Sequence, residues 1–175
     1  MIRHLCLADL PEMESLRRSE QESVGFIPMP RYELEVQRGN ILGLWEAGEL
    51  LAFCLATRQA PIGTIHQLVT RKDARLMERA SALVRAVEER SQGCVGLTCR
   101  CRENLEAVLF WPTVGFEEVR REPSGRRGSM IRYYRPLSPA LFLPEHFLRG
   151  PGFLAGQRVG FRRKRLEALP VGALV

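Results

Sequence analysis

The sequence predicts an α/β sandwich with a sheet of about six or seven strands, and three observations support that prediction. The chain has 175 residues, of which 45% are apolar and 26% charged, a composition typical of a folded protein with its own core. Segments rich in β-branched residues alternate with segments of helical period. That alternation ends near Pro136, so we expect one domain over residues 1–136 and a C-terminal extension over residues 137–175.

The first forty residues are predicted to form a short strand and two helices. The strand covers residues 1–7, and Asp9 is placed to cap a helix that starts near Pro11. A second helix is expected after Pro28 and to end at Gly39.

A β-hairpin and a further strand follow. The hairpin has two strands, at residues 41–45 and 50–57, joined by a polar turn at residues 46–49. Residues 64–70 are β-branched and apolar and predict the next strand.

The clearest helix comes directly after that strand and ends at Gly93. Its apolar residues repeat at helical spacing and form one stripe: Leu76, Ala80, Leu83, Val84 and Val87. Beyond it we expect a strand at 94–99, a helix at 105–111 broken by Pro112, and strands at 116–121 and 130–135.

Several classes of protein are excluded by the composition. No apolar run approaches the roughly 18 residues of a membrane span, and the first residues lack the pattern of a signal peptide, so we expect a cytoplasmic protein without membrane contact. The five cysteines are odd in number and irregularly spaced, and are expected to be reduced. The three histidines are scattered, and no metal site is expected.

The net charge of +6 is unevenly distributed. Residues 1–119 carry a net charge of −3 and residues 120–175 a net charge of +9. One interpretation is a general preference for arginine, which supplies 24 of the 26 basic residues; the other is that residues 149–165 bind nucleic acid or an acidic partner. A third is that the extension packs on the domain or on a second subunit in a homodimer.

The segment 65–84 is the most informative for function, because a strand runs through a charged turn directly into a helix. The free N–H groups at such a helix start attract anions. Two carboxylates, Asp73 and Glu78, face a larger set of basic residues there: Arg71, Lys72, Arg75 and Arg79. This is where a phosphate-bearing cofactor would be held.

The same segment carries a resemblance to the GNAT family of N-acetyltransferases, which covers residues 1–136. The family's cofactor motif has Arg or Gln first and a small residue last, positions that Arg75 and Ala80 match, with Glu78 at the first glycine. A second family signature matches in order and spacing at Asn104, Ala107, Phe110-Trp111 and Gly115-Phe116.

This resemblance implies a mixed, mostly antiparallel sheet flanked by about four helices, and acetyl transfer from acetyl-coenzyme A to an amine by direct attack. It implies that the cofactor lies between two diverging strands and on the following helix start. The cofactor-binding residues would then be Gln67, Leu68, Val69, Arg75, Leu76, Met77, Glu78, Arg79, Ala80 and Asn104.

Two catalytic candidates follow, each with a competing interpretation. His66 is a general base or a structural histidine of the strand. Trp111 stands where many family members carry a tyrosine acid, and an indole N–H has no useful acidity. Glu78 either repels phosphate or points outward.

Further side chains near the expected acceptor site are open to two interpretations. Glu20 and Glu22 bind a cationic amine or are solvated. Tyr32, Tyr133 and Tyr134 line the acceptor site or pack the strands. The chain as a whole is expected to be an N-acetyltransferase; the alternative is an inactive domain of the same fold that binds through its basic extension.

Overall fold

The computed structural model describes residues 1–74, 77–123 and 128–137. Its secondary structure, in chain order, is β1 (Ile2–His4), η1 (Leu7–Asp9), α1 (Leu10–Ser19), α2 (Met29–Gln37), β2 (Ile41–Glu46), β3 (Glu49–Gln59), β4 (Ile62–Thr70), η2 (Lys72–Ala74), α3 (Met77–Arg90), β5 (Gly96–Arg102), α4 (Ala107–Thr113), β6 (Glu117–Pro123) and β7 (Ser129–Pro136). The expected extension lies outside the described residues, apart from Leu137.

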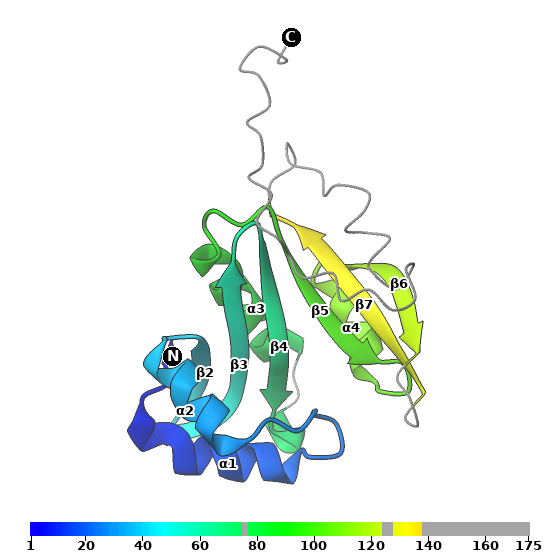
Figure 1. Cartoon of the computed structure of the whole chain (residues 1–175). Helices are drawn as coiled ribbons and strands as arrows, with labels where there is room; N and C mark the ends of the chain where they lie inside the picture. Colours follow the sequence, from blue (N-terminus) through cyan, green and yellow to red (C-terminus); the bar gives the residue numbers. More distant parts are fainter. Residues whose placement is uncertain (75–76, 124–127, 138–175) are drawn as a thin grey trace. The chain divides into compact units, whose positions relative to one another are not determined.

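The strands form one seven-stranded sheet in the order β1-β2-β3-β4-β5-β7-β6 (Figure 1). Neighbouring strands are antiparallel except β4 and β5, which are parallel. Parallel neighbours need a crossover connection, and α3 supplies it. The predicted mixed, mostly antiparallel sheet with four α-helices is confirmed.

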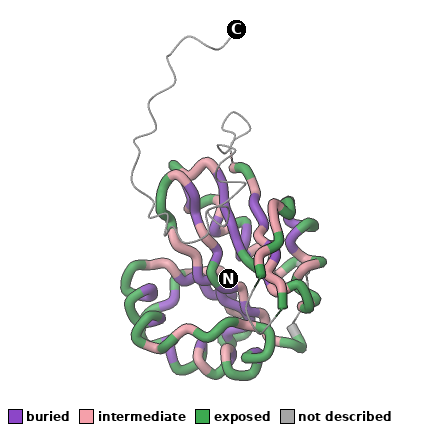
Figure 2. Tube along the Cα trace, turned by 45° about the vertical axis from the view of Figure 1, so that its right-hand side comes forward, coloured by how far each residue is buried: buried purple, intermediate pink, exposed green. Residues whose placement is uncertain are grey.

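The helices cover both faces of the sheet, and each face has its own apolar core. Figure 1 shows α1 and α2 in front of the sheet and α3 and α4 behind it. On the α1/α2 face the core includes Met13, Tyr32 and Phe53, and on the α3/α4 face it includes Leu83 and Trp111. Buried residues follow the strands and the inward sides of the helices (Figure 2).

The helices predicted after Asp9, after Pro28 and before Gly93 are confirmed, but two predictions differ from the structure. The helix expected at 105–111 and broken by Pro112 is Ala107–Thr113, so Pro112 lies inside it and does not end it. The other difference is at Asp9. Its carboxylate does not cap α1; it accepts the Cys6 N–H at 2.7 Å and pairs with Arg3 at 2.6 Å, which ties the chain back to β1. Gly39 ends the α2 segment with φ of +66°, a conformation that glycine adopts without strain.

Several strand boundaries differ from the sequence prediction. The first strand, expected at 1–7, is Ile2–His4, and the strand expected at 64–70 starts at Ile62. The strand expected at 94–99 begins at Gly96 and continues to Arg102, because Cys94 and Val95 still belong to the turn after α3. A side chain at position 96 would overlap the ring of Tyr134, so glycine is required where β5 starts. Among the described helices none is long and apolar enough to cross a membrane.

Candidate active site

The pairing between β4 and β5 stops half-way along both strands. It runs from the Ile62 and Gly96 pair to the Ile65 and Cys99 pair and goes no further, although β4 continues to Thr70. Beyond Ile65 the edge of β4 that faces β5 is therefore not paired with β5, and the two strands diverge (Figure 1). Peptide groups on such an edge can bind an extended ligand.

A β-bulge in β4 lies at the point of divergence. Leu55 pairs with Gln67 and Ala56 with Ile65, so His66 is the extra residue. A bulge bends its strand and can place two successive side chains on one face. Both His66 and Gln67 contact residues of the α1/α2 face: Thr57 bonds to the first and Tyr32 to the second.

His66 is exposed, and its Nε2 lies 2.7 Å from Thr57 Oγ1. Desolvation of the imidazole, followed by the positive charges of Arg31 and Arg100, lowers its pKa below the ordinary value of 6.5. The buried carboxylate of Glu35 opposes that shift but is itself paired with Arg31 at 2.8 Å. At neutral pH the imidazole is therefore uncharged and able to accept a proton.

Gln67 turns its side chain away from the diverging edge. The Tyr32 hydroxyl donates to Gln67 Oε1 at 2.5 Å, and Gln67 Nε2 donates to the Gly25 carbonyl at 2.5 Å. Burial raises the pKa of Tyr32 to about 12, so the hydroxyl stays protonated. Gln67 thus joins β4 to the loop between α1 and α2, and its side chain does not reach toward β5.

The loop at residues 20–28, between α1 and α2, has two further attachments. Glu20 is 7% exposed and accepts the backbone N–H of Lys72 at 2.9 Å, so the interpretation of Glu20 as a solvated residue is wrong. Arg102 of β5 donates to the carbonyl of Glu22, whose side chain is exposed. We call residues 20–28 the bridging loop, because they are bonded to both β4 and β5.

The start of α3 is described from Met77 onward, so Arg75 and Leu76 and the side chain of Met77 lie outside the described residues. Glu78 is exposed in the first turn. Two of the predicted phosphate-binding cations have carboxylate partners: Arg79 bonds to Glu46 at 2.5 Å, and Arg71 pairs with Glu49 and Asp73. The positive charge available to an anion there is smaller than the sequence count predicts.

Trp111 is buried on the α3/α4 face, 6% exposed, and packs edge-on against Phe116 with ring centroids 5.2 Å apart. The indole N–H meets the thiol sulfur of Cys101 on β5, and this hydrogen bond opposes the rise in the Cys101 pKa that burial causes. Sulfur is a weak acceptor. Asn104 is exposed in the turn that leads from β5 to α4.

The two catalytic candidates lie on opposite faces of the sheet. Trp111 and the half-buried Leu68 belong to the core of the α3/α4 face, whereas His66 bonds to Thr57 on the α1/α2 face. Of the tyrosines, Tyr133 and Tyr134 are buried in the sheet, which favours their packing role. A reaction that uses both faces would have to take place in the gap between β4 and β5.

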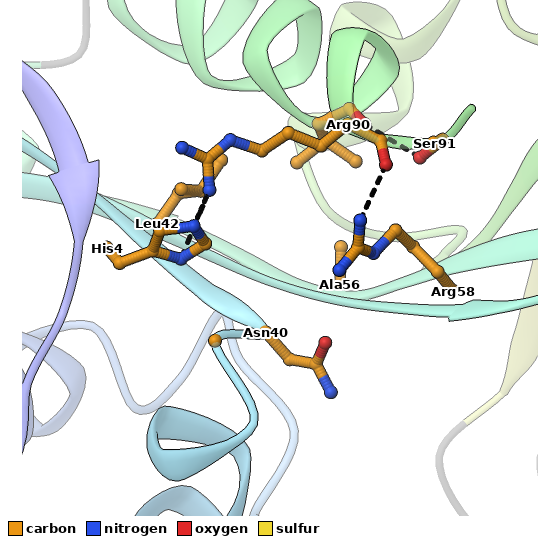
Figure 3. Close-up of a pocket in the computed structure, with 9 residues that line it drawn as sticks. His4, Asn40, Leu42, Ala56, Arg58, Arg90 and Ser91 are labelled. Atoms are coloured by element: carbon orange, nitrogen blue, oxygen red, sulfur yellow. Dashed lines mark hydrogen bonds between the residues drawn. The ribbon is translucent and has the colours of Figure 1, made fainter.

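A cavity of about 300 Å³ lies elsewhere, near the paired end of β4 (Figure 3). In Figure 3 the Arg58 guanidinium reaches the carbonyl of Arg90, and the Arg90 side chain extends to His4. These bonds close the end of α3 onto β1 and β3. None of the predicted site residues lines this cavity.

Comparison with known proteins assigns this geometry to a family. The model of the acetyltransferase (GNAT) family matches residues 10–116. The chain belongs to the GNAT family. Its resemblance to that family, predicted from the sequence, is confirmed. Acetyl-coenzyme A is the usual co-substrate of GNAT acetyltransferases.

Solved structures show the same fold at low sequence identity. The ribosomal-protein-S18-alanine N-acetyltransferase of Escherichia coli is 19% identical with a TM-score of 0.63, over 82% of this chain and 99% of that one. Aminoglycoside 6'-acetyltransferase type Ii is 17% identical with a TM-score of 0.60, over 79% of this GNAT chain and 98% of that one.

A third neighbour, N-acetylglutamate synthase from Neisseria gonorrhoeae complexed with coenzyme A and N-acetyl-glutamate, is 17% identical with a TM-score of 0.66. The match covers 79% of this GNAT chain but only 35% of that longer one. Among curated proteins none matches this chain.

Sequence reasoning missed three features of this GNAT site. The bulge at His66 gives no local signal in the sequence, because any residue can occupy a bulge position. The bond between Tyr32 and Gln67 joins residues 35 positions apart. The third feature is a row of arginines across β5, β7 and β6, which depends on the register between strands and leaves no local signal in the sequence.

Proposed function

We propose that this GNAT protein transfers the acetyl group of acetyl-coenzyme A to a primary amine. The observation that carries the proposal is the interrupted pairing of β4 and β5, which leaves an unpaired backbone edge from His66 to Thr70 beside a neutral imidazole. Acetyl-coenzyme A supplies an activated thioester carbonyl when bound.

The residues around the gap suit that cofactor. The edge of β4 at Leu68 and Val69 presents peptide groups that match the amides of an extended pantetheine chain. The buried N–H of Trp111 has the weak acceptor Cys101 beside it and would gain a stronger acceptor from a ligand in the gap. The N–H groups that open α3 would hold the pyrophosphate.

Within this proposal His66 is the general base. Direct attack needs an uncharged amine, and an exposed imidazole with a lowered pKa takes the proton from the acceptor nitrogen at neutral pH. Thr57, bonded to Nε2, holds the ring in place. Trp111 donates a hydrogen bond at most, because its indole is not acidic, and the proton for the departing thiolate comes from solvent.

Binding of acetyl-coenzyme A is tested by isothermal titration of the full-length protein. We expect saturable binding, weakened at least about tenfold in Arg75→Glu because a charge-assisted bond to phosphate contributes roughly 1.5–3 kcal/mol. Arg121→Glu is the matched control, since Arg121 lies on the edge strand β6 and pairs with Glu103 and Glu118. No heat and no thermal shift at millimolar acetyl-coenzyme A would overturn the proposal.

A second candidate function rests on the charge distribution and on Trp111. Residues 120–175 carry a net charge of +9, and the position of the usual tyrosine acid is filled by a non-acidic side chain. We infer as the alternative a catalytically inactive GNAT domain that contacts nucleic acid or an acidic partner through residues 149–165. Protein that binds acetyl-coenzyme A and releases thiol only when an amine is added would exclude this alternative.

A further inference from the structure

Three arginines stand in a row across the last three strands of the sheet. Arg100 of β5 is the direct register partner of Arg132 of β7, which is in turn the partner of Arg120 of β6. Directly opposite residues of antiparallel strands share a face and lie about 5 Å apart. We call these three residues the arginine ladder.

A row of like charges destabilises the sheet unless negatively charged groups bind to it. Like charges directly opposite each other destabilise a sheet, and here two such pairs share one residue. Glu122 lies among the three guanidinium groups, at 2.5 Å from Arg120, 2.7 Å from Arg132 and 3.9 Å from Arg100. The carboxylate described beside Arg100 and Arg132 is the same one for both, so these two arginines keep a positive excess within the described part of the sheet.

The arginine ladder lies on the same face as His66. Residues that alternate with it on β5 and β7, among them Cys99, Cys101 and Ile131, point into the core of the α3/α4 face, so the ladder points to the opposite face. Arg100 is close enough to His66 to affect its titration, and its side chain is 58% exposed. The ladder therefore starts beside the proposed base and leads away from it across two strands.

We infer that the arginine ladder binds the carboxylates of the acceptor, and that the acceptor is a peptide whose amino terminus is followed by acidic residues. This inference rests on the proposed function and names its substrate class. Guanidinium forks bind carboxylates in pairs of parallel hydrogen bonds, which suits a row of arginines better than a row of lysines.

The length of the ladder favours a peptide over a single amino acid. Strands are spaced about 4.8 Å apart, so the ladder extends roughly 10 Å beyond Arg100. An extended peptide advances about 3.3 Å per residue, and side chains two to four residues from the amine reach that far. Nucleic acid would satisfy the charge but carries no alkylamine to be acetylated at His66.

The test is equilibrium binding of two matched peptides, measured by titration calorimetry with and without saturating coenzyme A. The peptides are Ala-Asp-Glu-Glu amide and Ala-Asn-Gln-Gln amide, which differ in side-chain charge alone. We expect the acidic peptide to bind at least about tenfold more tightly at low salt. This preference should shrink as salt is added, because exposed charges are screened.

Variants separate the ladder from a general effect of positive charge. Arg100→Gln and Arg132→Gln should each reduce the preference for the acidic peptide several-fold, and both should stay folded because each removes a repelling charge. Arg121→Gln is the matched control: it removes the same charge from β6, but Arg121 is the partner of Ile131 and so lies on the other face. We expect it to keep the full preference.

Each contrary outcome has a definite meaning. Equal affinity for both peptides, no binding of either, or a preference that survives Arg100→Gln and Arg132→Gln would overturn the inference. Free glutamate binding as tightly as the acidic peptide would also overturn it, and so would a DNA oligomer that displaces the peptide through the same two arginines. Because the peptides are titrated without chemical turnover, failure of acetyl-coenzyme A to bind would count against the proposed function alone.

Discussion

At the scale of single residues, the site depends on where the β4 bulge places two neighbouring side chains. In a regular strand without a bulge, alternation would place His66 and Gln67 on opposite faces of the sheet. With it, the imidazole is beside Thr57 and the amide bonds to Tyr32. One histidine is thereby free to accept a proton while its neighbour holds the bridging loop.

His66→Gln should lower kcat by a factor on the order of 10²–10⁴, the usual contribution of a general base. In the wild type the pKa of His66 is lowered by desolvation, so the decline of kcat/KM on acidification should be centred at a lower pH than an ordinary imidazole would give. Thiol release measured against pH checks both expectations. His4→Gln is the matched control, since His4 lines the cavity of Figure 3 and not the candidate site. A His66→Gln enzyme with an unchanged kcat and an unchanged pH profile would show that His66 is not the general base.

Tyr32→Phe should destabilise the fold by about 1–2 kcal/mol, because it leaves the buried Gln67 Oε1 without its donor. Urea unfolding followed by circular dichroism measures the change. Tyr133→Phe is a suitable comparison, since that hydroxyl makes a longer bond of 3.4 Å to Val108 and should cost less. Equal midpoints for Tyr32→Phe and wild type would mean that water replaces the hydroxyl.

At the scale of elements, the order of helices and strands was predictable because hydrophobic period is a local property. The stripe of α3 is an example: Leu83 and Val84 are fully buried, as their spacing predicts. Facing and register were not predictable, because they depend on pairing between distant segments. Arg79 is an example. The sequence predicts that Arg79 binds phosphate, and its carboxylate partner Glu46 could not be foreseen because it comes from β2, 33 residues earlier.

Helix α1 carries an ion pair that should make stability depend on pH. Glu14 bonds to Arg17 at 2.7 Å and to Arg18 at 2.8 Å, and these partners lower the pKa of Glu14 to about 2. A carboxylate with a lowered folded pKa stabilises the fold above its unfolded value and loses that contribution as the pH falls toward 2. We expect wild type to lose free energy of unfolding between about pH 5 and pH 2.

In Glu14→Gln that pH-dependent loss should be smaller, by on the order of 2 kcal/mol. Chemical denaturation at pH 7 and at pH 3 measures how much free energy of unfolding each protein loses between the two pH values. Glu33→Gln, at an exposed position of α2, controls for the removal of one carboxylate. Identical pH dependence in wild type and Glu14→Gln would show that the ion pair contributes nothing measurable.

At the scale of the whole molecule, the sequence separates an acidic first part from a basic last part, and the site lies in the first. The division into a domain at residues 1–136 and an extension at 137–175 stays a prediction. Deleting residues 156–175 removes four net positive charges. We expect the shortened protein to remain folded and to bind acetyl-coenzyme A, but to lose affinity for polyanions.

Salt dependence measures that affinity in the full-length chain. If four or five basic residues contact phosphates of duplex DNA, log affinity should fall with log salt at a slope near −4, from about 0.9 per contact. An insoluble deletion, or a full-length protein that does not bind DNA at low salt, would assign the extension to packing or to a subunit interface.

The bridging loop has a consequence for how the two substrates affect each other. It is bonded to β4 through Gly25 and to β5 through Glu22, so any change in the separation of these strands changes the distance that the loop must span. Under the proposed function, a cofactor between the strands and an acceptor beside His66 would both bind next to the strands that this loop joins. Thermodynamic linkage makes their coupling reciprocal: the factor by which coenzyme A changes acceptor affinity equals the factor by which the acceptor changes that of coenzyme A.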